Sequence, residues 1–121
     1  NRMRTFIFTT ALPPLNVAWT KFILSRLGGW NDRRERLAEA ALRVQAAVRG
    51  AGRECPSSSH IVPFIVGESN QTILKAEDMQ RKGFYVLPVR PPTVPEGTSR
   101  LRISLTAAVT EEEVDSLCRE L

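Results

Sequence analysis

The sequence is poor in the residues from which metal sites and nucleophilic sites are usually built. Its 121 residues include one histidine, His60, and two cysteines, Cys55 and Cys118. A Cys/His zinc site cannot be assembled from this set, and a Ser/His/Asp or Cys/His arrangement would depend entirely on His60. A Gly-rich phosphate loop is also missing. We therefore predict no metal site and no catalytic group from this sequence.

Long hydrophobic runs and blocks of like charge are missing too. The apolar stretch from Leu12 to Leu27 contains Asn16, Lys21 and Arg26, so it is too polar for a membrane span. The N-terminus does not have the pattern of a secretory signal. The net charge is +4, but the arginines alternate with glutamates along one predicted helix, which favours a solvated helix face over a nucleic-acid site. We expect a cytoplasmic protein with no membrane or nucleic-acid partner.

The composition that is present is that of a globular protein. Hydrophobic residues make up 42% of the chain and charged residues 25%, which excludes an intrinsically disordered chain. The length allows one domain, or a small domain with a segment of its neighbour. The chain starts with Asn1 and leads directly into a strand-like stretch at 5–9, so we expect it to be a piece of a longer protein.

Apolar spacing and turn residues divide the chain into alternating elements. Helices are expected over 14–27, 32–50, 69–81 and 110–121, and strands over 60–66, 84–89 and 100–105. Asp32, Ser69 and Thr110 are the predicted helix caps, and Pro63 predicts an edge position or a bulge for its strand. The predicted fold is α+β, with a short, mostly antiparallel sheet and helices on one face. Residues 1–29 are interpreted as the end of a large domain and a long connecting helix, and residues 30–121 as a small C-terminal domain.

A proline-stiffened loop at 91–97 precedes a strand whose polar face carries Arg100 and Arg102. The planar fork of arginine suits bidentate binding of a carboxylate, and a rigid mount fixes its geometry. An arginine on a strand is more often an ordinary surface residue, so both interpretations stay open from the residues alone. The acidic run Glu111-Glu112-Glu113 begins a predicted helix, where carboxylates favour the helix dipole, and this explanation is preferred over a metal site.

Two long motifs resemble the α-oxoamine synthase family of pyridoxal-phosphate enzymes. The stretch from Phe84 through Val89-Arg90-Pro91-Pro92-Thr93 and Thr106-Ala107-Ala108 to Asp115 is similar to the family's C-terminal signature. The stretch from Phe6 to Pro14 is similar to a second family motif, and shorter matches at 59–67 lie between them in the family's order. The resemblance implies the small C-terminal domain of an aminotransferase-like enzyme.

The resemblance also implies a reaction and a set of site residues. The family condenses an amino acid with an acyl thioester on pyridoxal 5'-phosphate, with loss of carbon dioxide. Arg102 matches the arginine that holds the amino-acid carboxylate, and Thr93 matches a loop residue near the substrate pocket. Thr10, with Thr9 beside it, matches the contact to the cofactor phosphate of the neighbouring subunit in a homodimer.

The loop 89–93 favours the branch that joins L-alanine to a pimeloyl thioester, giving 8-amino-7-oxononanoate in biotin biosynthesis. The alternatives are another branch, of the aminolevulinate synthase or 2-amino-3-oxobutyrate ligase type, or a non-catalytic binding module on this fold. Val109 departs from the histidine that members commonly have there. In the family the catalytic lysine lies before the position of Asn1, and Lys21, Lys75 and Lys82 match nothing catalytic. We therefore expect residues 1–121 alone to be inactive.

Overall fold

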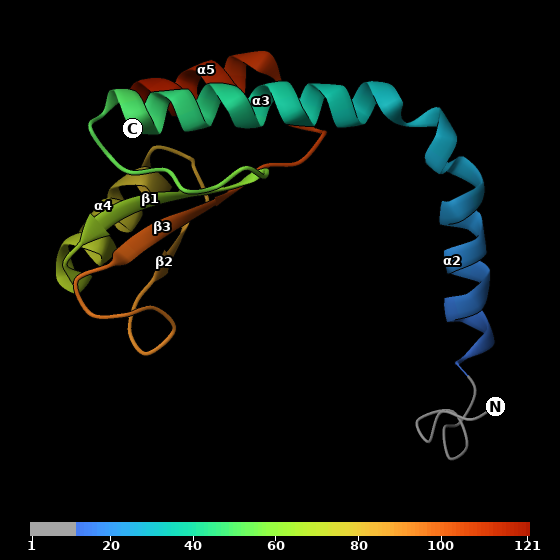
Figure 1. Cartoon of the computed structure of the whole chain (residues 1–121), viewed down its shortest axis with the longest axis horizontal. Helices are drawn as coiled ribbons and strands as arrows, with labels where there is room; N and C mark the ends of the chain where they lie inside the picture. The colour runs from blue at the N-terminus through green and yellow to red at the C-terminus, as the bar shows by residue number, and fades with distance from the viewer. Residues whose placement is uncertain (1–11) are drawn as a thin grey trace. The chain divides into compact units, whose positions relative to one another are not determined.

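A computed structural model describes residues 12–121 (Figure 1). The chain divides into two compact units, one up to Asp32 and the other from Arg33 to Leu121. The described part of the first unit holds helix α2 (Pro14–Arg26) and the 3-10 turn η1 (Leu27–Gly29). The predicted strand at 5–9 lies outside the described residues.

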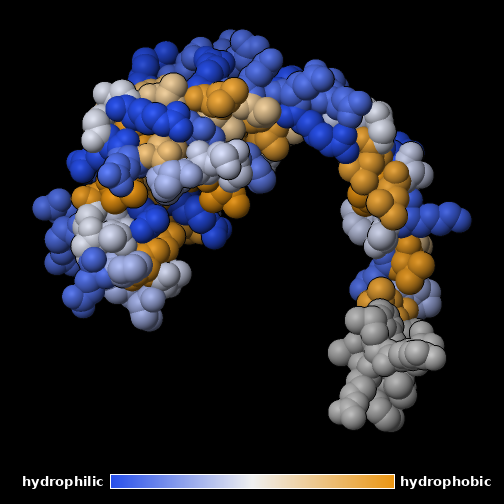
Figure 2. Space-filling view, in the orientation of Figure 1, coloured by the Kyte–Doolittle hydropathy of each residue, from blue (hydrophilic) through white to orange (hydrophobic). Residues whose placement is uncertain are grey.

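Helix α2 begins as the sequence predicts, with proline in its first turn, where the missing N–H is no loss. None of its residues is buried. Its exposed apolar side chains include Leu15, Trp19, Phe22 and Leu24. Figure 2 shows hydrophobic surface along the visible face of this helix. Trp19 and Phe22 stack with ring centroids 5.7 Å apart. A helix with this many exposed apolar side chains is typically covered by another part of the protein or by a partner subunit.

The second unit is an α+β domain, as predicted. Helix α3 (Asn31–Gly50) leads through a loop to β1 (Ile61–Gly67), α4 (Ser69–Arg81), β2 (Leu87–Val89), β3 (Ser99–Ser104) and α5 (Glu111–Glu120). The three strands form an antiparallel sheet in the order β1-β3-β2. The strand that carries Pro63 is at an edge, as the proline predicts.

The core lies between the sheet and the helices on one of its faces. Cross-strand pairs Val62–Ile103 and Phe64–Leu101 are buried on that face. They belong to a single hydrophobic cluster with apolar side chains of α3, α4 and α5. Residues at the alternate positions of β1 and β3 point to the opposite, outer face, because successive side chains of a strand alternate. The alternation predicted for 100–105 is confirmed.

Ion pairs and hydrogen bonds tie the helices together at the surface. Arg43 of α3 pairs with Asp115 of α5. Lys82 Nζ lies 2.7 Å from Glu120 Oε2 and 3.0 Å from Asp78 Oδ2, which raises the pKa of the lysine through its hydrogen bonds to Glu120 and Asp78. Lys75 Nζ donates to the Glu120 carbonyl at 3.0 Å. The end of α5 is therefore fixed on α4.

Three local predictions need correction. Ser69 does not cap α4: the cap is Glu68, whose side chain accepts from the Gln71 amide, and Ser69 instead hydrogen-bonds Ser99 at 3.1 Å. Helix α3 begins at Asn31, so Asp32 lies inside its first turn. The strand predicted over 84–89 is confined to 87–89.

That strand is short because the backbone just before it already has other partners. The Phe84 amide donates to the Met79 carbonyl and closes α4, and the Val86 carbonyl accepts from Gln80 Nε2. The predicted capping box of α5 is confirmed, with Thr110 and Glu113 each accepting the other's amide. Within residues 12–121 no helix is long and apolar enough to cross a membrane.

Candidate substrate-carboxylate site

Arg102 lies at the middle of the sheet, on its outer face. It is on the central strand β3, opposite Pro63 of β1 and Leu87 of β2. The residues on either side of it in sequence, Leu101 and Ile103, are buried in the core, so the strand cannot rotate about its axis without exposing them. The packing of the inner face therefore fixes the face of the sheet from which the Arg102 side chain projects.

Thr93 reaches the same face from the loop between β2 and β3. Its amide donates to the Arg90 carbonyl at 3.0 Å, closing a turn at the start of the loop, and the Pro91–Pro92 peptide is cis. Gly97 adopts a φ of 73°, a conformation that favours glycine, where the chain turns back toward β3. The loop thus brings Thr93 to the same hollows as Arg102, although the two residues are nine positions apart in sequence.

Two hollows meet at this pair of residues. Arg102 and Thr93 line both of them: one, of ≈ 330 Å³, extends along β2 and the start of the loop, and the other, of ≈ 440 Å³, extends across to Pro56, Ser57, Ile61 and Pro63. These volumes are in the range of small-molecule sites. The second hollow is mostly apolar, with Arg100 and Arg102 as its cationic members.

The guanidinium of Arg102 makes no hydrogen bond or ion pair within residues 12–121. The ion pairs that join Arg43 to Asp115, Arg81 and Lys82 to Asp78, and Lys82 to Glu120 do not include it. An arginine with its five N–H donors unused, above an apolar hollow, is suited to a carboxylate or another planar anion. The structure brings the two predicted substrate residues together at one place, which their sequence separation alone does not require.

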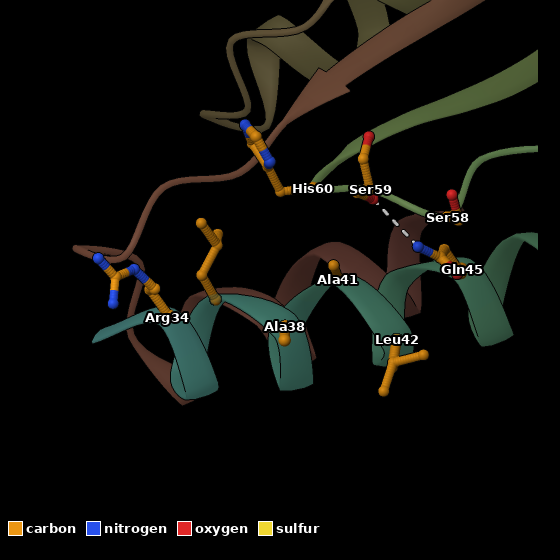
Figure 3. Close-up of a pocket in the computed structure, with 9 residues that line it drawn as sticks. Arg34, Ala38, Ala41, Leu42, Gln45, Ser58, Ser59 and His60 are labelled. Atoms are coloured by element: carbon orange, nitrogen blue, oxygen red, sulfur yellow. Dashed lines mark hydrogen bonds between the residues drawn. The ribbon is translucent and has the colours of Figure 1, made fainter. Parts of the chain in front are cut away.

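The predicted cofactor residues Thr9 and Thr10 lie outside the described residues. His60 is exposed and precedes β1, and its carbonyl accepts from the Leu105 amide. It belongs to a different hollow, between α3 and the segment 58–60 (Figure 3), where Gln45 Nε2 donates to the Ser59 carbonyl at 3.0 Å. Leu37, Ala38, Ala41 and Leu42 of α3 line that hollow together with polar and charged residues of α3 and of the segment 58–60.

The remaining titratable candidates have structural environments. Glu113 caps α5, and Glu111 and Glu112 lie in the same first turn. Groups of acidic, histidine or cysteine side chains able to hold a metal do not occur in the described part of the chain. Cys118 packs at the edge of the core, and burial raises the pKa of its thiol, so it has little thiolate character.

Sequence reasoning alone did not point to Ser57 and Pro56 at this site. They precede β1 in an irregular loop, and only the pairing of β1 with β3 brings them to the wall of the hollow. Ser57 Oγ donates to the Ile61 carbonyl at 2.7 Å and accepts from the Ser59 amide. A proline followed by three serines at 56–59 is typical of a loop, but this composition does not indicate what the loop contacts.

Comparison with known proteins places this arrangement in a family. The whole chain, residues 1–121, matches the aminotransferase class I and II family. It is 47% identical over 118 residues to the 8-amino-7-oxononanoate synthase of Haemophilus ducreyi, covering 97% of this chain and 30% of that protein.

Two solved structures are similar in fold. An 8-amino-7-oxononanoate synthase from Francisella tularensis superposes with a TM-score of 0.78 at 25% identity, over 97% of this chain and 34% of that one. A lysine-to-alanine variant of a serine palmitoyltransferase from S. paucimobilis, with a bound PLP–myriocin aldimine, gives a TM-score of 0.81 at 28% identity, over 97% of this chain and 30% of that one. The chain spans about a third of the length of these relatives. It belongs to the aminotransferase class I and II family.

Proposed function

We propose that this chain is the substrate-carboxylate part of an α-oxoamine synthase that condenses L-alanine with a pimeloyl thioester. The products would be 8-amino-7-oxononanoate and carbon dioxide, as in biotin biosynthesis. The observation that carries the proposal is the unpaired Arg102 beside Thr93 at the hollow on the outer sheet face. The 47% identity to an 8-amino-7-oxononanoate synthase supports the choice of branch.

Arg102 has the geometry to hold the carboxylate that leaves as carbon dioxide. Two parallel N–H groups of a guanidinium can bind both carboxylate oxygens, which fixes the direction of the bond between the carboxylate and Cα. Because Leu101 and Ile103 are buried in the core, β3 presents Arg102 on the outer face of the sheet. Orientation of this kind is a positioning contribution to catalysis. Thr93 provides a hydroxyl group at the same rim.

The cofactor of the proposed reaction is pyridoxal 5'-phosphate, which would act as the electron sink for the bond that Arg102 orients. Hydroxyl groups are suitable donors for a phosphate, and Thr9 and Thr10 are the residues proposed to supply them, across the interface of a homodimer. In the described domain, Lys75 and Lys82 bind Glu120, which occupies both ammonium groups away from the hollow. We propose that residues 1–121 alone do not bind the cofactor covalently and are inactive.

The test is an assay of the protein that contains this chain, with pyridoxal phosphate, L-alanine and pimeloyl-CoA, and detection of 8-amino-7-oxononanoate by mass spectrometry. We expect product that depends on both substrates. Omission of either substrate is the control. No product with alanine and any acyl thioester would contradict the proposal.

A second branch is kept as an alternative because of the likeness to serine palmitoyltransferase, with its TM-score of 0.81. A competition among L-alanine, glycine and L-serine separates the branches. A strong preference for glycine or serine would replace the proposed substrate while leaving the role of Arg102 unchanged. For the chain alone, borohydride trapping with pyridoxal phosphate should give no stoichiometric lysine adduct.

A further inference from the structure

The loop that carries Thr93 is held by two turns of its own. At its start, the Thr93 amide donates to the Arg90 carbonyl at 3.0 Å. At its end, the amide and Oγ1 of Thr98 both donate to the Pro95 carbonyl, at 3.2 and 2.7 Å. These bonds shape each end of the loop locally. They do not attach the loop to the face of the sheet where Arg102 lies.

One side chain of β3 hydrogen-bonds the end of the loop, close to the point where the strand begins. Arg100 Nε donates to the Thr98 carbonyl at 2.9 Å. Within residues 12–121 this is the only hydrogen bond from a side chain outside 90–98 to the loop. Arg100 is partly buried and lies two positions before Arg102, so both arginines project from the outer face of β3. Its terminal nitrogens have no hydrogen-bond partner in the described residues.

We propose that Arg100 is a positioning residue for the substrate-carboxylate site. Its Nε hydrogen bond to Thr98 fixes the 90–98 loop on β3, so that Thr93 stays beside Arg102. The inference rests on the proposed function for its kinetic consequence, whereas its structural part, the ordering of the loop, is independent of any activity. Arg100 would act through the loop; because its side chain also lines the second hollow, the test separates this role from direct contact with a bound anion.

The shape of the arginine side chain allows a sharp test. Its donor to Thr98 is Nε, which is part of the side-chain stem, and lysine has a carbon at that position. Arg100→Lys therefore keeps the positive charge and most of the packing while losing the Nε–H donor. If Arg100 instead served the site as a second cation for a bound anion, the lysine variant would preserve that role. Arg100→Gln removes the charge and serves for comparison.

The experiment compares wild type, Arg100→Lys and Arg100→Gln in the complete protein that contains this chain. Hydrogen exchange of the loop amides, including Thr93 and Thr98, is followed by mass spectrometry, and steady-state kinetics are measured with L-alanine as the varied substrate. The matched control is Arg81→Lys, because Arg81 is an exposed arginine on α4 whose ion pair with Asp78 spans 3.5 Å.

For both Arg100 variants we expect faster exchange across 90–98 and a KM for alanine raised about two- to tenfold, the scale of one hydrogen bond, with a smaller change in kcat. The Arg81 control should match wild type. Loop exchange equal to wild type in Arg100→Lys would overturn the proposal. So would a normal KM in Arg100→Lys combined with a raised KM in Arg100→Gln, because charge and not the Nε bond would then be responsible. If wild type lacks activity, the proposed function fails, and the exchange data still decide whether Arg100 orders the loop.

Discussion

Replacing Arg102 by lysine should separate the proposed substrate-binding role of this residue from its effect on the stability of the domain. The substitution keeps a positive charge at the middle of β3 but replaces a bidentate fork by a single ammonium group. One charge-assisted hydrogen bond is worth about 1.5–3 kcal/mol, and about 1.4 kcal/mol corresponds to a factor of ten. The expected loss in kcat/KM for L-alanine is therefore about 10- to 150-fold.

The free energy of unfolding should change little in the same variant. The side chain of Arg102 is exposed and makes no hydrogen bond or ion pair within residues 12–121. Surface substitutions of this kind usually change stability by about 0.5 kcal/mol or less. The contrast is with Leu101→Ala on the same strand, which removes a fully buried side chain and should cost about 2–5 kcal/mol.

The assay is steady-state turnover with alanine varied at saturating pimeloyl-CoA, together with urea denaturation of each variant. Arg81→Lys provides the control for a conservative change at an exposed arginine. The reasoning would be refuted if Arg102→Lys retained kcat/KM within about threefold of wild type, less than the loss of one charge-assisted bond. A loss of stability comparable to that of Leu101→Ala would also refute it, since Arg102 would then be a structural residue.

Three further predictions concern folding and association. Thr110→Ala should lower the free energy of unfolding by about 1 kcal/mol in urea denaturation, because the amide of Glu113 loses its acceptor, whereas Thr110→Ser should restore most of it. The hydrogen bonds from the start of α4 lower the pKa of Glu68 below its ordinary value of 4.5, so its contribution to stability is complete above that pH and is lost as the pH falls through the lowered value. Thermal melts should therefore show Glu68→Gln less stable than wild type at pH 7, with the difference shrinking toward pH 3; a constant difference would contradict the assignment. The isolated chain should self-associate through α2, where Trp19 and Phe22 are 63% and 44% exposed, and replacing both by serine should reduce the mass measured by light scattering; a wild-type chain that is monomeric at high concentration would refute this.

Much of the local structure follows from residue pattern alone. The alternation at 100–105 predicted the buried Leu101 and Ile103 and the outward Arg102, because a strand that covers a core on one side has no other way to place them. The capping box at Thr110 and Glu113 was also readable, since both of its hydrogen bonds are made within one turn. The cap predicted at Ser69 was wrong because its hydroxyl group bonds Ser99, a residue distant in sequence. The strand predicted at 84–86 was wrong because the Val86 carbonyl accepts from the Gln80 side chain and not from a neighbouring strand.

The sequence by itself determined which residues were available for a site. It contains two family motifs and an arginine on a predicted strand, and it has too few histidines and cysteines for a metal site or a catalytic triad. Tertiary structure decided where they meet. Antiparallel pairing of β1 and β2 on either side of β3 brings Thr93, Ser57 and Arg102 to one hollow. Periodicity within a segment reports which face is buried, but it carries no information about which strand lies alongside. For that reason Arg102 could be predicted from the sequence as a candidate, whereas the residues that line the hollow around it could not.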